Sequence, residues 1–253
     1  MSLHEAAARR GERPRRNRWV AAMAGISILI AAGTASAQPV QFATFNHPGN
    51  QRPFTFTNTG SGGTFTASTQ VSFNFTGIPG LPAELTGDQD ATLTLTATAT
   101  APAIANGTLF DQPLNGAVLS FTRNSPSGGL TNLLTANFSG VLSGRNGSRA
   151  ATLDASNTSG DTVVFTSSFL DFSQTISRSL ALGFSAVTPM ISNGPGGFLA
   201  SFTASGVGTF SSEPPPVVNV IPLPASIVLL GAGLAGVPIA SIFRRKQAPI
   251  ASA

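Results

Sequence analysis

Threonine alternates with apolar residues over residues 91–100, which read Ala-Thr-Leu-Thr-Leu-Thr-Ala-Thr-Ala-Thr. Successive side chains of a β-strand point to opposite faces, whereas the side chains of a helix return to one face about every 3.6 residues. The stretch therefore predicts a strand with one apolar face and one face of hydroxyl groups.

The same two-residue period recurs through residues 50–211. Residues 71–76 place Val71, Phe73 and Phe75 on one face and polar side chains on the other. Thr and Phe favour strands because branched and flat side chains pack well on a pleated surface. We expect further strands at 54–57, 64–67, 117–123, 133–138, 150–153, 162–167, 180–187, 198–203 and 208–211.

Turn residues separate these strands. Asn106-Gly107 and Asn115-Gly116 predict tight hairpins, because such hairpins need a positive φ that Gly adopts freely. Asp161 and Asp171 are expected to cap turns, and residues 77–90 to form a longer loop with Pro79 and Pro82.

The pattern predicts an all-β body, and its many short strands favour an antiparallel β-sandwich or a jelly roll. An outer-membrane barrel also alternates every second residue, but it normally carries girdles of Tyr and Trp at its interfaces. The chain has no Tyr, and its single Trp is Trp19, outside the body. We therefore expect the sandwich.

Composition indicates how the body is stabilised. The chain has no Cys, so disulfide bonds contribute nothing. Of its 18 Phe residues, all except Phe243 lie within residues 38–220. We expect Phe, together with Leu, Val and Ala, to build the core.

The basic residues gather at the two ends of the chain, so the overall net charge of +4 does not describe the body. Residues 38–220 carry five Arg against eight Asp and Glu, a net charge of −3. A nucleic-acid-binding domain needs clustered basic residues on its folded surface. The sequence therefore predicts no nucleic-acid partner.

Residues 1–37 have the features of a secretory signal peptide. An Arg-rich start precedes the apolar run 19–34, which is too short for a comfortable membrane span. Ala35 and Ala37 are the small residues that signal peptidase requires, and they predict cleavage before Gln38. An uncleaved anchor is the alternative.

The C-terminal region has three parts in order. A Pro-rich linker with a Pro-Leu-Pro-Ala motif occupies residues 213–224, and an uncharged apolar stretch follows at 225–243. The stretch would measure about 28 Å as a helix, close to the hydrocarbon thickness, so we expect a transmembrane helix. A basic tail, 244–253, begins with Arg244, Arg245 and Lys246 and predicts a cytoplasmic end. The body, residues 38–212, would then lie outside the membrane.

This C-terminal region resembles the PEP-CTERM sorting signal in its VPLPA-type variant. The resemblance rests on Pro222, Leu223, Pro224 and Ala225, the Gly-rich helix and the terminal basic cluster, and covers about the last thirty residues. It implies an exosortase-like membrane protease as partner, which cuts near the motif and releases the body to the cell surface or medium. It also implies a bacterium that makes exopolysaccharide and biofilm. Leu223 replaces the commoner Glu, and Ile221 the usual Val.

Few side chains in the body could perform chemistry. His47 is the only His left after signal removal, and it sits near the processed N-terminus, where we expect a solvated loop residue. Glu84, Asp88 and Asp90 could hold a calcium ion through hard oxygen ligands, or two of them could serve a glycosidase. We expect neither catalytic residues nor a cofactor.

The sequence thus predicts an exported, non-enzymatic protein that is structural or polysaccharide-associated in the extracellular matrix. It would be held briefly in the inner membrane and then sorted to the cell surface or the medium. The alternatives are an exported carbohydrate-active hydrolase, and a small-ligand or calcium-dependent adhesion module.

Overall fold

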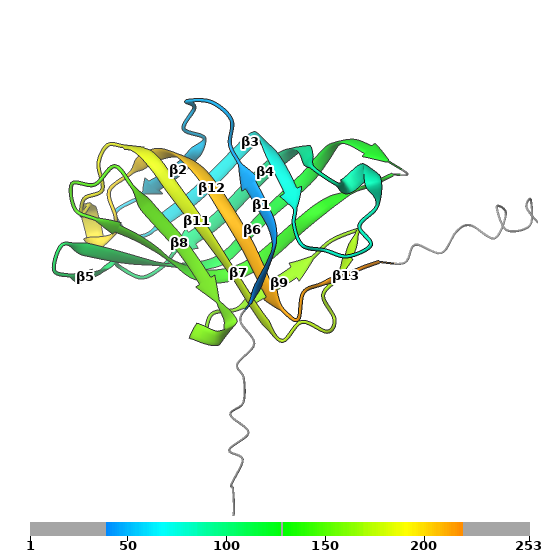
Figure 1. Ribbon diagram of the computed structural model, residues 1–253. Coiled ribbons are helices and arrows are strands. Elements are labelled where there is room, and N and C mark those ends of the chain that lie inside the picture. The colour runs from blue at the N-terminus through cyan, green and yellow to red at the C-terminus, as the bar shows by residue number, and fades with distance from the viewer. Residues whose placement is uncertain (1–38, 128, 220–253) are drawn as a thin grey trace, which may run out of the picture. The chain divides into compact units, whose positions relative to one another are not determined.

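The computed structural model describes residues 39–127 and 129–219 and is all-β (Figure 1). Within these residues there are thirteen strands, three short 3-10 helices and no α-helix. The strands are β1 Val40–Asn46, β2 Phe54–Asn58, β3 Gly63–Phe75, β4 Asp88–Ala99, β5 Ile104–Asn106, β6 Leu109–Ser127, β7 Leu130–Arg145, β8 Ala151–Ser156, β9 Val163–Thr166, β10 Leu170–Asp171, β11 Ser177–Thr188, β12 Phe202–Glu213 and β13 Val217–Val218. The 3-10 helices are Ala83–Leu85, Asn157–Ser159 and Pro195–Gly197.

The expected two-sheet sandwich is wrong, because one antiparallel sheet closes on itself as a barrel. Eight strands follow one another in the order β6-β4-β3-β1-β12-β11-β8-β7, and β7 pairs with β6 to complete the circle. The circle depends on a long-range contact, because β12, the last long strand, pairs with β1 and β2 at the start of the body. The longest strands are β6 and β7. These strands have 19 and 16 residues, and each pairs with the other along one edge and with β4 or β8 along the other edge.

Two positions in the barrel wall are each shared by two short strands. β1 and β2 both pair with β3 and β12, and the loop 47–53 leaves the wall between them. β8 and β9 likewise pair with successive parts of β7. The wall is therefore interrupted on two sides, and side chains from adjoining loops meet it there.

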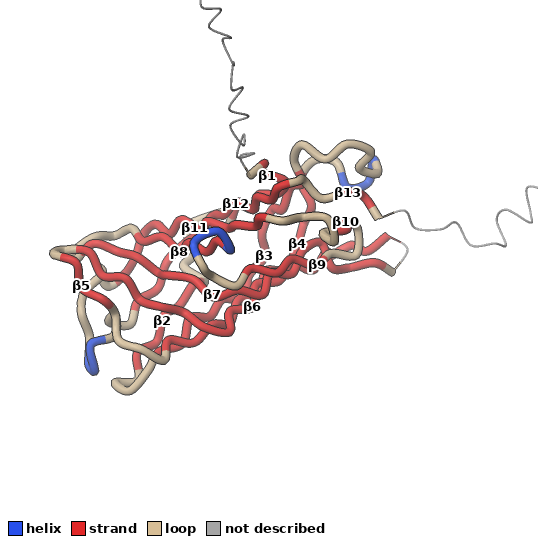
Figure 2. Tube along the Cα trace, turned by 90° about the horizontal axis from the view of Figure 1, so that it is seen from below, coloured by secondary structure: helices blue, strands red, loops and turns tan. Residues whose placement is uncertain are grey.

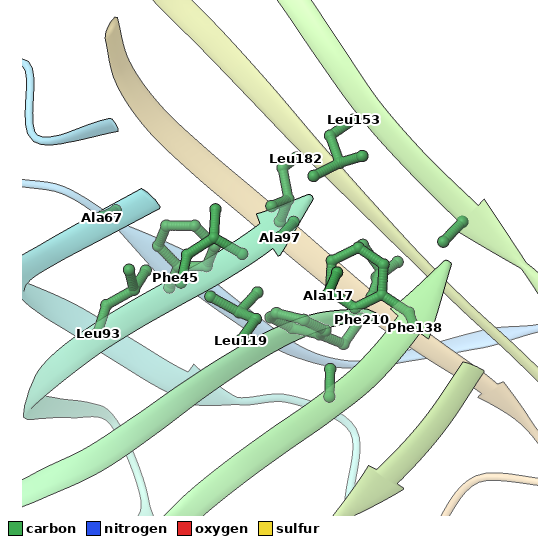
Figure 3. Close-up of a cluster of buried hydrophobic side chains, with 14 of the residues drawn as sticks. Phe45, Ala67, Leu93, Ala97, Ala117, Leu119, Phe138, Leu153, Leu182 and Phe210 are labelled. Carbon is green, nitrogen blue, oxygen red and sulfur yellow. The ribbon is translucent and has the colours of Figure 1, made fainter. Parts of the chain in front are cut away.

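Apolar side chains fill the barrel interior, as the alternating pattern predicted (Figure 3). Phe210 is fully buried, and its ring meets Phe121 edge to face at 5.5 Å between centroids. Phe42, Phe165 and Phe172 also pack together, and Phe210 joins them to the same cluster. Such ring pairs add about 0.5–1.5 kcal/mol each beyond the burial of their area.

Both ends of the described chain reach the same end of the barrel (Figures 1 and 2). Val40 pairs with Ser212, and β13 pairs with β10. Asn219 donates its backbone N–H to the carbonyl of Phe169 at 2.8 Å. We call this the terminal end. The opposite end, where β7 finishes at Arg145, is the distal end.

Several expected boundaries differ from the structure. β4 begins at Asp88, so the predicted loop 77–90 ends three residues earlier. Asn115-Gly116 forms a bulge inside β6 instead of a hairpin, since the register with β7 shifts between Leu114 and Ala117. Residues 198–201 precede β12 without being part of it, and β1 was not predicted.

The predicted signal peptide, sorting motif and membrane helix lie outside the described residues. This applies to Ala35, Ala37 and Gln38, to the motif Pro222, Leu223, Pro224 and Ala225, and to Arg244, Arg245 and Lys246. Of the predicted linker 213–224, residues 213–219 are described. Between residues 39 and 219, no helix is long and apolar enough to cross a membrane.

Candidate functional site

Three neighbouring strands, β3, β4 and β6, turn a polar face outward, which only Val118 of β6, opposite Thr96, interrupts among the described residues. Register aligns their hydroxyl and amide side chains in rows: Thr64 and Thr66 of β3 stand opposite Thr98 and Thr96 of β4. We call this surface the polar wall. It consists of Thr64, Thr66, Ser68, Gln70, Thr92, Thr94, Thr96, Thr98, Ser120, Thr122 and Asn124.

Side chains of the polar wall bond to one another across the strands. Thr94 and Ser120 share a hydrogen bond of 2.7 Å between their hydroxyls. Gln70 donates from Nε2 to Thr92 Oγ1 at 3.0 Å, and Thr92 donates to Asn124 Oδ1 at 2.8 Å. The Asn124 amide donates back to Gln70 Oε1, which closes a ring of three side chains. This ring holds the amides in fixed orientations.

The polar wall is neutral and lacks aromatic rings. None of its residues is charged. Asp88 and Asp90 lie on β4 just beyond the wall, toward the terminal end. Among the described residues every Phe is buried, apart from Phe110, which is half-buried. The wall can therefore recognise a ligand chiefly by hydrogen bonds, and each Thr or Ser hydroxyl can donate one and accept two.

The three carboxylates proposed as calcium ligands are not gathered into one site. Asp88 and Asp90 face outward from β4, separated along the strand by about 7 Å, and Asp88 accepts a hydrogen bond from Asn74 at 3.0 Å. Glu84 belongs to the 3-10 helix Ala83–Leu85. Among the described residues no group of three His, Asp or Glu side chains is placed to hold a metal ion. Asp88 and Asp90 share one open strand face, so they do not face each other across a cleft as glycosidase carboxylates do.

His47 was expected in solvent, but the structure buries it to 7% exposure. It begins the loop that interrupts the β1–β2 position, and its Nδ1 lies 3.5 Å from Ser205 Oγ of β12. Desolvation lowers the pKa of His47 below its ordinary value of 6.5. A base that activates a nucleophile typically lies about 2.6–3.2 Å from it. The distance between His47 Nδ1 and Ser205 Oγ is longer, so His47 does not activate Ser205 as a nucleophile.

Asp161 and Asp171 cap turns, as predicted. Asp161 accepts the backbone N–H of Ser156 at 3.0 Å, and Asp171 accepts both the N–H and the hydroxyl of Ser173. Asp161 also lines a shallow groove of about 420 Å³ with Asp154 on β8. Because one of these two carboxylates already serves a turn, the groove offers little free chemistry.

Sequence reasoning found the Thr face of β4 but missed Asn124. This residue lies 54 positions from Gln70, and only strand register brings the two amides together.

Comparison of the chain with models of protein families, with curated proteins and with solved structures finds no match.

Proposed function

We propose that this protein is exported, sorted by an exosortase-type protease and released, and that it is a non-enzymatic component of the extracellular matrix that associates with neutral polysaccharide. One observation carries the polysaccharide part of the proposal, namely the polar wall. It is neutral, it spans three strands, and it presents hydroxyls that repeat about every 7 Å along a strand and 4.8 Å across strands.

The chemistry of the wall determines the strength of binding. A hydrogen bond that replaces two bonds to water contributes only about 0.5–1.5 kcal/mol. Without an exposed ring for a sugar to stack on, a single monosaccharide binds weakly. A long polymer that contacts many hydroxyls at once, or several barrels at once, is held by avidity.

The sorting part of the proposal is supported by the sequence features at both ends and by the form of the body. Exported proteins often rely on disulfides, but this body has no Cys. Its Phe-rich barrel interior supplies a core that is stable without them. The test is the intact mass and location of the protein in cells with and without the exosortase. A species that starts at Gln38 and ends near Pro222–Ala225 is expected. A chain that still ends at Ala253 in the inner membrane would contradict it.

The polysaccharide part has its own test. Thr94→Val and Thr96→Val together remove two hydroxyls while keeping branched side chains that suit a strand. We expect co-sedimentation with a neutral exopolysaccharide to fall several-fold, with the free energy of unfolding almost unchanged. Thr152→Val, on the exposed face of β8 away from the wall, is the matched control. Equal retention of all three proteins on the polymer would exclude the polar wall as its binding surface.

A further inference from the structure

Exposed apolar residues gather at the two ends of the barrel. At the distal end these are Ile104, Leu109 and Met190, and Ile104 is 63% exposed. At the terminal end they are Val40, Ile176 and Val217, and Ile176 is 82% exposed. Together they make up six of the nine large apolar side chains exposed among the described residues.

Two of the distal apolar residues, Leu109 and Met190, lie beside arginines, whereas Ile104 pairs with Asp111. Leu109 pairs directly with Arg145. Ile191, the neighbour of Met190, donates its N–H to the Ser148 carbonyl, next to Arg149. No described hydrogen bond engages either Arg side chain. We call this the distal patch. It comprises Ile104, Leu109, Arg145, Arg149 and Met190.

The terminal apolar residues lie beside two carboxylates. Ile176 donates its backbone N–H to the Glu213 carbonyl at 2.7 Å, and Val217 pairs with Asp171. Val40 pairs with Ser212, next to Glu213. We call this the terminal patch. It comprises Val40, Asp171, Ile176, Glu213 and Val217.

Counted over each whole end, with the patch residues included, the net charge has the same polarity. The terminal end carries six carboxylates, Glu84, Asp88, Asp90, Asp161, Asp171 and Glu213, against Arg123 and Arg178, a net charge of −4. Both of these guanidinium groups donate to backbone carbonyls of the terminal end. The distal end carries Arg145 and Arg149 against Asp111, a net charge of +1.

We propose that the released protein self-assembles head to tail, with the distal patch of one copy against the terminal patch of the next. A contact between two different surfaces of identical molecules does not close on itself unless the rotation happens to close a ring, so it builds an open filament. Apolar contact supplies attraction, and the opposite charges fix the orientation, because a head-to-head contact would place like charges together. Such a filament would be a structural element of the matrix.

Processing would control this assembly, a step that rests on the proposed function. The predicted membrane helix begins at residue 225, six residues after Asn219, and six extended residues span at most about 20 Å. The terminal patch of an anchored chain therefore stays too near the bilayer for a second body, since a compact domain of this length is about 40 Å across. Cleavage of the sorting motif would free this patch.

The test uses two charge-reversed proteins. Arg145→Glu with Arg149→Glu makes both patches acidic, and Asp171→Lys with Glu213→Lys makes both patches basic. We expect each variant alone to associate at least about tenfold more weakly than the wild type, a change of about 1.4 kcal/mol. An equimolar mixture of the two is expected to regain association, because every acidic patch then meets a basic one. A folding defect cannot produce that recovery.

Each protein is purified as the full chain with a specific protease site inserted after Asn219, so that the body can be released in vitro without an exosortase. Light scattering and sedimentation velocity are recorded before and after cleavage at low and high salt. Growth that begins after cleavage and weakens with salt supports the proposal. A wild-type body that stays monomeric, or a mixture that behaves like its separate components, overturns it. The intact-mass measurement in cells tests sorting independently.

Discussion

At the scale of single residues, His47 makes the stability of the body depend on pH. Burial lowers the pKa of this imidazole in the folded state below 6.5, the ordinary value that the unfolded chain retains. As pH falls below 6.5, the unfolded chain takes up a proton before the folded one does. The contribution of His47 is therefore fully present above 6.5 and is lost as pH falls toward the lowered folded pKa.

This dependence is measured by urea denaturation of the released body at pH about 7.5 and about 5.5. We expect the free energy of unfolding to be lower at the acidic pH, and His47→Gln to remove part of that difference, whatever its effect at neutral pH. The change is expected to be modest, because His47 lies close to the protein surface. Equal pH slopes for the two proteins would contradict the assignment.

Gly196 is a second position where one residue decides local structure. Its φ is +68°, and a Cβ atom added there would lie 1.9 Å from the backbone oxygen of Gly60. We expect Gly196→Ala to lower the free energy of unfolding by at least about 2 kcal/mol, since the left-handed conformation alone costs an L-residue about 1–2 kcal/mol. Thermal and urea denaturation measure the loss.

Gly80→Ala is the control for that substitution. Gly80 has a similar φ of +74°, but a Cβ atom there would meet nothing within 4 Å. Its cost is expected to be the conformational part alone, about 1–2 kcal/mol. If the two variants lose equal stability, the approach of the 195–197 turn to Gly60 has no energetic importance.

At the scale of strands, alternation predicted which side chains face inward but not how the strands close. Leu93 and Leu95 are buried and Thr94 is exposed, as the pattern of 91–100 required. A sandwich and a barrel bury the same alternate residues, however. The difference depends on β12, the last long strand, pairing with β1 and β2 at the start of the body, which no local pattern records.

Register limited what could be predicted of the polar wall. The hydroxyl face of β4 follows from its own sequence, whereas its contacts with Gln70 and Asn124 require the alignment of three strands. Slipping a strand by one residue turns every side chain to the other face. The Asn115-Gly116 bulge adds to the difficulty, because Asn-Gly also suits a hairpin and only the continuing pairing of β6 with β7 excludes one.

At the scale of the whole molecule, β12 is the strand on which closure depends. It pairs with β11 on one edge and with both β1 and β2 on the other. The barrel can therefore close only after β12, its last long strand, has formed. The two described chain ends, at Val40 and Asn219, then lie at the same end of the barrel, which makes them suitable for joining.

Two circular permutants test this view of closure. Both join Asn219 to Val40 by a flexible Gly/Ser linker, and one opens the chain in the exposed β5–β6 turn at Gly107 while the other opens it at Gly208 within β12. We expect the first to unfold cooperatively with a free energy within about 1–2 kcal/mol of the parent, the scale of a changed loop closure. The second divides the strand that joins β11 to β1, so we expect no cooperative transition in urea. If the protein opened at Gly208 folds as stably as the one opened at Gly107, closure through β12 does not hold the barrel together.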